Sequence, residues 1–365
     1  MSTLLKDLYN KKFYDNFSVV LENHVPDFEK KKFCKMIFST DFDSMELKDR
    51  MRHTATVLNY FLPNGFEKSI SIIIKCISQI KSQSSNWGSI EYLFFADYIE
   101  RYGIDYYEQS VEALEFTTQF ITCEFAVRPF LIKYPKMVLQ MKKWAKHNDA
   151  KVRRLATEGI RPRLPWAMAL PEFKKNPVKV LEILEILKND ESEFVRRSVA
   201  NNLNDISKDH PNVIIEIAKN WKGISKETDD IIKHASRTLL KQGHNDILNH
   251  YGLNSKNILV QNLKIEKSKV KIGDNLSFSF ELENTNKTLK YIRLEYAIYF
   301  LRQNGSYGKK VFKISEKEYQ KQSITFISKS HSFRIITTKK YYLGQQFLSV
   351  ICNGMESEKV GFVLI

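Results

Sequence analysis

The spacing of apolar residues divides the chain into a helical part and a strand-rich part. Before about residue 253, apolar residues recur every three or four positions, as on the buried face of an α-helix. After that point, apolar and polar residues alternate with a period of two, as in half-buried β-strands. The sequence therefore predicts a helical domain over residues 1–252 and an all-β domain over residues 253–365.

The helical part contains an internal repeat between residues 135 and 245. Three segments begin at Pro135, Pro177 and Pro211, a residue that suits the first turn of a helix, and each is followed by a polar break and a second helical run. The prolines are 42 and 34 residues apart, and a unit of this length with two helices is typical of a HEAT-like α-solenoid. The first 130 residues are also helical in pattern, and we expect them to continue and cap the solenoid.

The C-terminal part has the pattern of a β-sandwich. Every second residue is apolar in 276–282 and again in 292–300, so each run presents one apolar face. Two Asn-Gly pairs, Asn304-Gly305 and Asn353-Gly354, favour tight hairpin turns. About seven short strands in this region predict an immunoglobulin-like sandwich.

The chain is strongly basic, with a formal net charge of +15. Residues 255–365 contain 19 Lys and Arg against 9 Asp and Glu, so +10 of that charge lies in the β part. Such a surface favours contact with a phosphate backbone, and the alternative is a basic face that is merely solvated. The sequence contains no run of 18 or more apolar residues, so we expect no membrane span. The four scattered cysteines have no metal-ligand spacing and are typical of reduced thiols in a cytoplasmic protein.

The stretch 153–170 is the most unusual part of the sequence. Gly159, Pro162 and Pro165 must end the helix that carries Arg154 and Glu158, and they make the following loop stiff. A stiff loop that contains two arginines and a tryptophan suits a functional site, because its groups are fixed before a ligand arrives.

Each of these residues also has an ordinary explanation. Arg154 and Glu158 are four residues apart, so they could form a surface ion pair on one helix face. Trp166 lies among apolar neighbours and could be a core residue. Arg154 and Arg197 occupy matching places in successive repeats, and His234 follows them in the third, which predicts a basic stripe along one face of the stack.

Three stretches together resemble a known family. Residues 158–166, 194–211 and 234–241 are similar to the HEAT-repeat DNA alkylation-repair glycosylases, specifically their AlkC branch, of which some members carry a C-terminal Ig-like domain. The resemblance implies excision of cationic bases from double-stranded DNA, chiefly N3-methyladenine, with N3-methylcytosine as a further candidate. It implies no metal and no cofactor. We expect a monomer in the cytoplasm that is associated with the nucleoid when it binds DNA.

The resemblance also implies roles for particular residues. Glu158 is the first candidate for a catalytic carboxylate, Glu124 the second and Asp205 the third, and Trp166 is expected to line the lesion site. Two of the carboxylates have structural alternatives, since Glu124 could pair with the residue four positions later and Asp205 could cap a helix or bridge to an arginine of another repeat. The residues expected to bind DNA are Arg154, Arg161, Arg163, Arg197, Arg128, Arg237 and Lys241.

The chemistry of a cationic lesion fits a carboxylate. An N3-alkylated purine leaves as a neutral molecule, so the enzyme mainly needs negative charge near the sugar and a base that orients water. Because a solenoid offers a groove more readily than a deep pocket, we expect the lesion to stay largely exposed at the groove and not to flip fully. Two rival hypotheses are a DNA-binding repeat protein without turnover and a scaffold for a protein partner.

Overall fold

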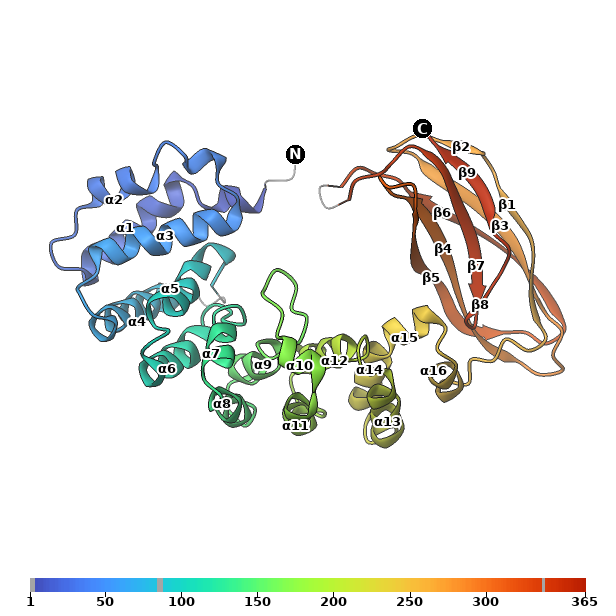
Figure 1. Ribbon diagram of the computed structural model, residues 1–365, viewed down its shortest axis with the longest axis horizontal. Coiled ribbons are helices and arrows are strands. Elements are labelled where there is room, and N and C mark those ends of the chain that lie inside the picture. The colour runs from blue at the N-terminus through green and yellow to red at the C-terminus, as the bar shows by residue number, and fades with distance from the viewer. Residues whose placement is uncertain (1–3, 84–87, 337–338) are drawn as a thin grey trace. The chain divides into compact units, whose positions relative to one another are not determined.

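The computed structural model describes residues 4–83, 88–336 and 339–365, with helices as far as His250 and strands from Ile258 onward (Figure 1). The α-helices are α1 (Lys11–His24), α2 (Lys30–Ile37), α3 (Leu47–Phe61), α4 (Phe66–Gln83), α5 (Phe94–Tyr102), α6 (Tyr107–Thr118), α7 (Val127–Lys133), α8 (Met137–Trp144), α9 (Ala150–Glu158), α10 (Pro171–Lys175), α11 (Val178–Leu187), α12 (Glu193–Ile206), α13 (Pro211–Trp221), α14 (Lys226–Ala235), α15 (Arg237–Gln242) and α16 (Asn245–His250). Three short 3-10 helices are η1 (Leu5–Leu8), η2 (Phe42–Ser44) and η3 (Ile90–Leu93). In the described part of the chain, no helix combines the length and the apolar character that a membrane span requires.

The chain divides into two compact units. The first contains the residues up to Asp209 together with Lys222–Ala235, and the second contains His210–Trp221 and Ser236–Ile365. The change from helix to strand falls where the sequence predicts it, but α13, α15 and α16 group with the strands. The division into domains at residues 252 and 253 therefore stays a prediction.

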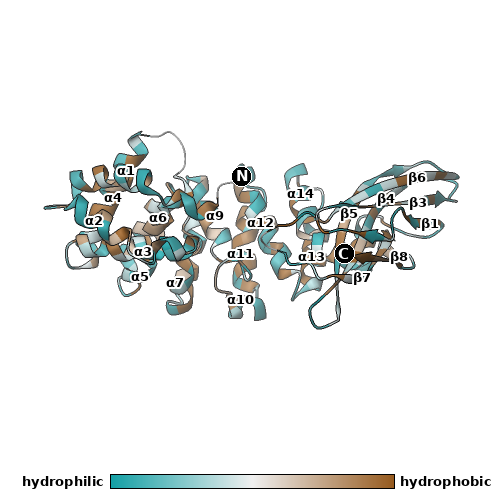
Figure 2. Ribbon diagram, turned by 90° about the horizontal axis from the view of Figure 1, so that it is seen from above, coloured by the Kyte–Doolittle hydropathy of each residue, from teal (hydrophilic) through white to brown (hydrophobic). Residues whose placement is uncertain are grey.

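Paired helices build the first unit, as the repeat predicts. Helix α8 packs against α9, α11 packs against α12, and α12 also contacts α9 and α14. In Figure 1, α9, α12 and α14 form one row, and α6, α8 and α11 lie along a second row. Figure 2 shows that the helices carry both hydrophilic and hydrophobic residues, as amphipathic elements of a stack do.

The buried faces follow helical spacing. In α8 the buried side chains are Met137, Met141 and Trp144, at intervals of four and three residues. Many of the largest fully buried side chains lie nearer the N-terminus and are aromatic, and they include Tyr14, Phe17, Phe33, Phe94 and Phe95. These N-terminal helices are thus held by a core of ring contacts, such as the 5.1 Å between the Phe17 and Phe94 ring centroids.

The second unit contains a β-sandwich. Its strands are β1 (Ile258–Ile265), β2 (Lys269–Val270), β3 (Asn275–Asn284), β4 (Lys290–Leu301), β5 (Tyr307–Tyr319), β6 (Ser323–Ser332), β7 (Gly344–Cys352), β8 (Met355–Glu356) and β9 (Val360–Leu364). One sheet has the order β1-β3-β6 and the other β2-β9-β7-β4-β5, with β8 paired to β7. The described residues thus form nine strands, whereas about seven were expected. The sequence pattern does not reveal β2 and β8, because each is only two residues long.

The sandwich core is the one that the alternating pattern predicts. Leu276, Phe278, Phe280 and Leu282 of β3 are all buried, and they face the apolar residues of β4. Asn304-Gly305 joins β4 to β5, and Asn353-Gly354 joins β7 to β8 with positive φ at both residues. Both hairpin predictions are confirmed.

Candidate active site

The site is built where α9 ends. Asp149 caps the start of α9, since its Oδ1 accepts a hydrogen bond from the Lys151 amide at 2.7 Å. Gly159 follows the last residue of α9, and a Cβ there would lie 2.5 Å from the Val127 side chain, so only glycine fits. The chain then leaves the helix as a loop that leads to α10, as the glycine and prolines predict.

Arg128 of α7 holds this loop from inside. Its guanidinium donates to the carbonyls of Gly159 and Arg161 at 2.9 Å each and to that of Met168 at 2.8 Å. Burial, and then repulsion from the Arg161 cation, lower the pKa of Arg128 to about 10. The side chain is fully buried, so the prediction that Arg128 contacts DNA is corrected to a role in fixing the loop. The alternative pairing of Glu124 with Arg128 is also wrong, because this guanidinium binds carbonyls.

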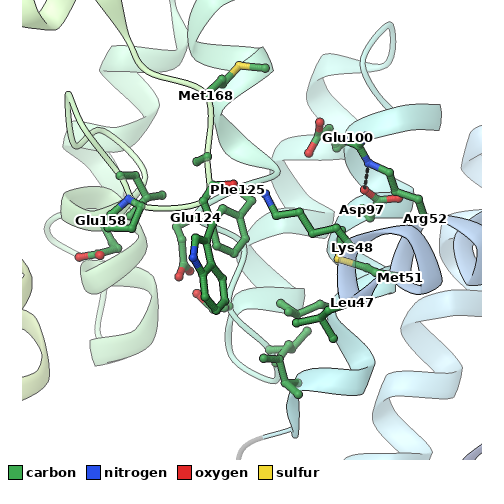
Figure 3. A pocket seen from close by; sticks show the side chains of 18 of the residues that line it. Leu47, Lys48, Met51, Arg52, Asp97, Glu100, Glu124, Phe125, Glu158 and Met168 are labelled. Carbon is green, nitrogen blue, oxygen red and sulfur yellow. Dashed lines mark hydrogen bonds and ion pairs between the residues drawn. The ribbon is translucent and has the colours of Figure 1, made fainter. Parts of the chain in front are cut away.

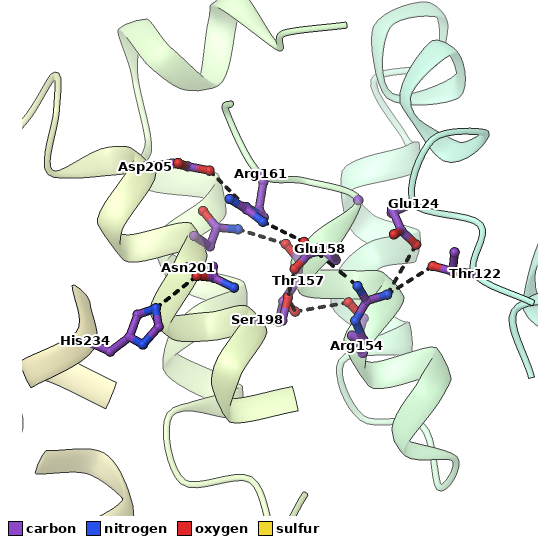
Figure 4. Close-up of polar contacts among 12 residues, drawn as sticks. Thr122, Glu124, Arg154, Thr157, Glu158, Arg161, Ser198, Asn201, Asp205 and His234 are labelled. Atoms are coloured by element: carbon purple, nitrogen blue, oxygen red, sulfur yellow. Dashed lines mark hydrogen bonds and ion pairs between the residues drawn. The ribbon is translucent and has the colours of Figure 1, made fainter. Parts of the chain in front are cut away.

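Glu158 lies at the centre of a buried polar network (Figure 4). Its Oε1 accepts from Arg161 Nη1 at 2.6 Å and lies 3.9 Å from Arg154 Nη2. Its Oε2 accepts from the hydroxyl of Ser198 at 2.5 Å. Both carboxylate oxygens are therefore engaged, and the pairing with Arg154 is a buried contact, not the surface ion pair considered from the sequence.

Asp205 of α12 joins the same network from the next repeat. Its Oδ2 accepts from Arg161 Nε at 2.9 Å, and its Oδ1 accepts from Lys208 Nζ at 2.9 Å. Although burial opposes the charge on Arg161, the carboxylates of Glu158 and Asp205 outweigh it and raise the pKa of Arg161. The bridge to an arginine of another repeat, one of the alternatives for Asp205, is what the structure shows.

Glu124 approaches the network from the segment between α6 and α7. Its Oε2 accepts from Arg154 Nη1 at 3.2 Å, and the same Nη1 donates to Thr122 Oγ1 at 3.0 Å. Arg154 also stacks on the Phe194 ring at 4.6 Å. The other oxygen of Glu124, Oε1, accepts no hydrogen bond from the residues that the structure describes. Glu124 is thus the candidate carboxylate with an uncommitted oxygen.

Trp166 is not a core residue, because 65% of it is exposed. Its φ is 66°, in the left-handed region that a tryptophan rarely adopts. The ammonium group of Lys48, on α3, donates to the carbonyl oxygen of Trp166. Cations thus hold this part of the loop at two carbonyls, Lys48 at that of Trp166 and Arg128 at that of Met168.

A cavity of about 720 Å³ opens beside this loop (Figure 3). Glu124, Phe125, Glu158, Arg161 and Trp166 contribute to its lining. The unit thus offers more than the open groove expected from the sequence. The prediction that a lesion stays exposed at the groove remains untested.

Two of the other cations predicted to bind DNA, Arg163 and Arg197, form ion pairs with carboxylates outside this network. Arg163 pairs with Asp209 at 2.7 Å and is half-buried, and Arg197 is exposed and pairs with Glu193 at 2.7 Å. The His234 ring is 2.9 Å from Asn201 Oδ1 (Figure 4). Arg237 and Lys241 lie on α15, in the second unit, where both are exposed. A DNA-binding role for these residues stays a prediction.

Sequence reasoning missed several polar residues of the site. Ser198 lies between Val195 and Leu203 on the buried face of α12. A hydroxyl group on an otherwise apolar helix face could have been recognised in the sequence as a buried hydrogen-bonding residue. Its Oγ also accepts from Thr157 Oγ1 at 2.5 Å. Lys48 and Glu100 also line the cavity, but they lie on helices more than 50 residues before Glu158 in the chain. No local sequence pattern distinguishes them.

The fold and the site define a helical-repeat protein that holds buried carboxylates and arginines beside a cavity and carries an Ig-like sandwich. A family model described as DNA alkylation repair enzyme matches residues 96–239, and one described as the C-terminal Ig-like domain of the uncharacterised protein YhaZ matches residues 259–365. The uncharacterised protein YhaZ of Bacillus subtilis (strain 168) is 40% identical over 360 residues, which are 98% of each chain. The solved structure of Pseudomonas fluorescens alkylpurine DNA glycosylase AlkC, bound to DNA containing an abasic site analogue, matches with a TM-score of 0.92 and 30% identity over all of both chains.

The chain therefore belongs to the DNA alkylation repair enzyme family, in its AlkC-like branch. The resemblance inferred from the sequence is confirmed, and so is the fold class, an α-solenoid of HEAT-like repeats followed by an Ig-like sandwich.

Proposed function

We propose that this protein is a DNA glycosylase that releases cationic alkylated bases from double-stranded DNA. N3-methyladenine is the first expected substrate and N3-methylcytosine the second. The observation that carries the proposal is the pair of buried glutamates, Glu124 and Glu158, that meet at Arg154 beside an exposed tryptophan and a cavity. The similar AlkC structure was determined with DNA containing an abasic site analogue, which resembles the product of such a reaction.

The site contains the charge that this reaction needs. A cationic base leaves without being protonated, so the main demand is stabilisation of the positive charge that develops on the sugar. Two unit charges about 4 Å apart interact by about 4 kcal/mol at an effective dielectric constant of about 20. If that interaction arises only in the transition state, it accelerates the reaction by roughly a thousandfold.

Glu124 is the carboxylate best placed for this role, although Glu158 was the first candidate from the sequence. Glu124 lines the cavity and has an oxygen, Oε1, that no described residue occupies, so it can face the sugar or orient water. Both oxygens of Glu158 are taken by Arg161 and Ser198. We therefore assign Glu158 mainly to holding the arginines, and Asp205 to holding Arg161.

The basic sandwich is proposed to contact the phosphate backbone. Its net charge of +10 over residues 255–365 is more than the fold itself requires. If DNA is the partner, affinity falls steeply as salt is added, because bound phosphates release counterions. A flat affinity between low and physiological salt would favour the rival hypothesis of a protein scaffold.

The direct test is release of free methylated base from methylated duplex DNA. Wild type is expected to release base, and Glu124→Gln is expected to lose most of the rate, up to about a thousandfold. Glu158→Gln and Asp205→Asn are expected to lose less while they retain DNA binding. Glu182→Gln is the matched control, since Glu182 is an exposed residue of α11 that pairs with Lys142. No release by wild type would end the enzyme proposal, and full activity of Glu124→Gln would return the role to Glu158.

A further inference from the structure

The cavity has a second polar wall, which faces Glu124 and Glu158. It is formed by α3 and α5, and Figure 3 shows Glu100, Asp97 and Arg52 there, on the opposite side from Glu124 and Glu158. Lys48 extends between the two sides, with its ammonium group 5.7 Å from the centre of the Phe125 ring. The rest of the lining is largely apolar and includes Leu47, Met51, Leu93, Leu164, Pro165 and Met168.

Glu100 offers an open acceptor at this wall. It makes no hydrogen bond or ion pair with any residue that the structure describes, and burial together with the nearby Asp97 raises its pKa to about 7. Asp97 is buried, lies 3.8 Å from Arg52 and 3.9 Å from Arg101, and its Oδ2 accepts no hydrogen bond from the described residues. An apolar cavity with a few convergent polar groups whose pKa values are shifted is typical of a small-molecule site.

We propose that this cavity binds the excised base itself, a flat methylated aminopurine whose ring lies on the apolar lining and whose amino group faces Glu100. The inference rests on the proposed function, because that function supplies the ligand. It extends that function from a site that cleaves the glycosidic bond to a site that receives the product.

The charge of the cavity favours a base over the backbone of DNA. Four carboxylates line it, those of Asp97, Glu100, Glu124 and Glu158, against three cations, and two of these cations, Arg52 and Arg161, are already within ion-pair distance of carboxylates. A phosphate placed among these carboxylates would be repelled, whereas an aminopurine donates N–H groups to them. The volume of about 720 Å³ lies within the range of known ligand pockets.

Lys48 gives the cavity a defined edge. Because its ammonium group donates to the Trp166 carbonyl, it connects α3 to the loop that carries the exposed indole. The same ammonium group lies near the Phe125 ring, so Phe125 and Trp166, two of the aromatic residues that line the cavity, contact one cation. Phe125 and Trp166 therefore offer aromatic surface to a flat ligand at this edge of the cavity.

The test uses the full chain and free 3-methyladenine without DNA. Equilibrium dialysis is expected to show saturable binding to wild type, and the same compound is expected to inhibit base release from methylated DNA. Met51→Trp fills the cavity and is expected to weaken binding by at least about tenfold. Leu139→Trp is the matched control, because Leu139 is an exposed residue of α8 that does not line the cavity. Glu100→Gln is a milder variant that leaves the packing intact, and it is expected to weaken binding by about tenfold.

The results separate this proposal from the proposed function. If wild type releases base from DNA but binds no free 3-methyladenine, the cavity proposal is overturned and the glycosylase proposal stands. Equal binding by wild type, Met51→Trp and Glu100→Gln would also overturn it. If wild type binds the free base in this cavity but releases none from DNA, the glycosylase proposal fails instead. Should Met51→Trp not fold, Glu100→Gln decides the outcome.

Discussion

Helices α9 and α12 carry the same pair of arginines in successive repeats, yet the two pairs have different surroundings. Arg154 of α9 is largely buried between Glu124, Thr122 and the Phe194 ring. Arg197 of α12 has 67% of its side chain exposed and, among the residues that the structure describes, forms an ion pair only with Glu193 of its own helix. The position in the repeat is therefore not what defines the site. The difference comes from the segment between α6 and α7, which brings Glu124 to α9.

The largest expected effect concerns Arg161, which connects the two helices by binding Glu158 of α9 and Asp205 of α12. Arg161→Met leaves both carboxylates buried without their shared cation, and we expect it to lower the free energy of unfolding by about 3–5 kcal/mol. Arg163→Met is the control from the same loop, and it removes a partly exposed pair with Asp209 that contributes about 1 kcal/mol or less. Urea unfolding followed by circular dichroism measures both. Equal losses for the two variants would show that the link between the helices carries no special stability.

Arg161 also marks the limit of prediction from the sequence. The helices, the repeat and the alternating faces of the sandwich were predictable, because periodicity reports which side of each element is buried. The shared helix face of Arg154 and Glu158 was predictable from their spacing. A bridge from Asp205 to an arginine of another repeat was only one of several alternatives, and nothing in the sequence singled out Arg161, because the bond joins residues 44 positions apart and depends on how α9 packs against α12. For the same reason Arg128 was read as a DNA contact although it is buried against three carbonyls.

The second pair of equivalent arginines, Arg153 and Arg196, is expected to show a smaller difference in the free energy of unfolding. Arg153 is buried and donates to both oxygens of Asp190, at 2.6 and 3.0 Å, whereas Arg196 donates to the backbone carbonyls of Asp190 and Glu191. Arg153→Met is expected to cost about 3 kcal/mol, because the side chain of Asp190 is buried and would lose its cation. Arg196→Met is expected to cost about 1 kcal/mol, because only hydrogen bonds to carbonyls are lost. The same unfolding assay would contradict this contrast if Arg196→Met were the more damaging variant.

Arg154 and Arg197 are also expected to differ in their effects on base release and on DNA binding. This prediction rests on the proposed glycosylase activity. Arg154→Met frees Glu124 from its partner, and we expect about a tenfold loss in the single-turnover rate of base release, which corresponds to about 1.4 kcal/mol. Arg197→Met is expected to leave that rate nearly unchanged and to reduce the slope of log affinity against log salt by about one, as the loss of one phosphate contact does. If the two variants changed the rate equally, the basic stripe and not the local partners of Arg154 would define the site.

The smallest expected effect concerns Ser198, the hydroxyl that α12 contributes to Glu158 of α9. Ser198→Ala removes one hydrogen bond from Glu158 Oε2 and one partner from Thr157, and we expect it to lower the free energy of unfolding by about 1 kcal/mol. Ser78→Ala is the control, because its hydroxyl donates only to the Ile74 carbonyl of its own helix and is exposed. Base release should slow only a few-fold in Ser198→Ala, since Arg161 still holds the other oxygen of Glu158. A loss as large as that of Glu124→Gln would mean that Glu158, held by Ser198, is the carboxylate that acts on the sugar, and the division of labour between the two glutamates would be reversed.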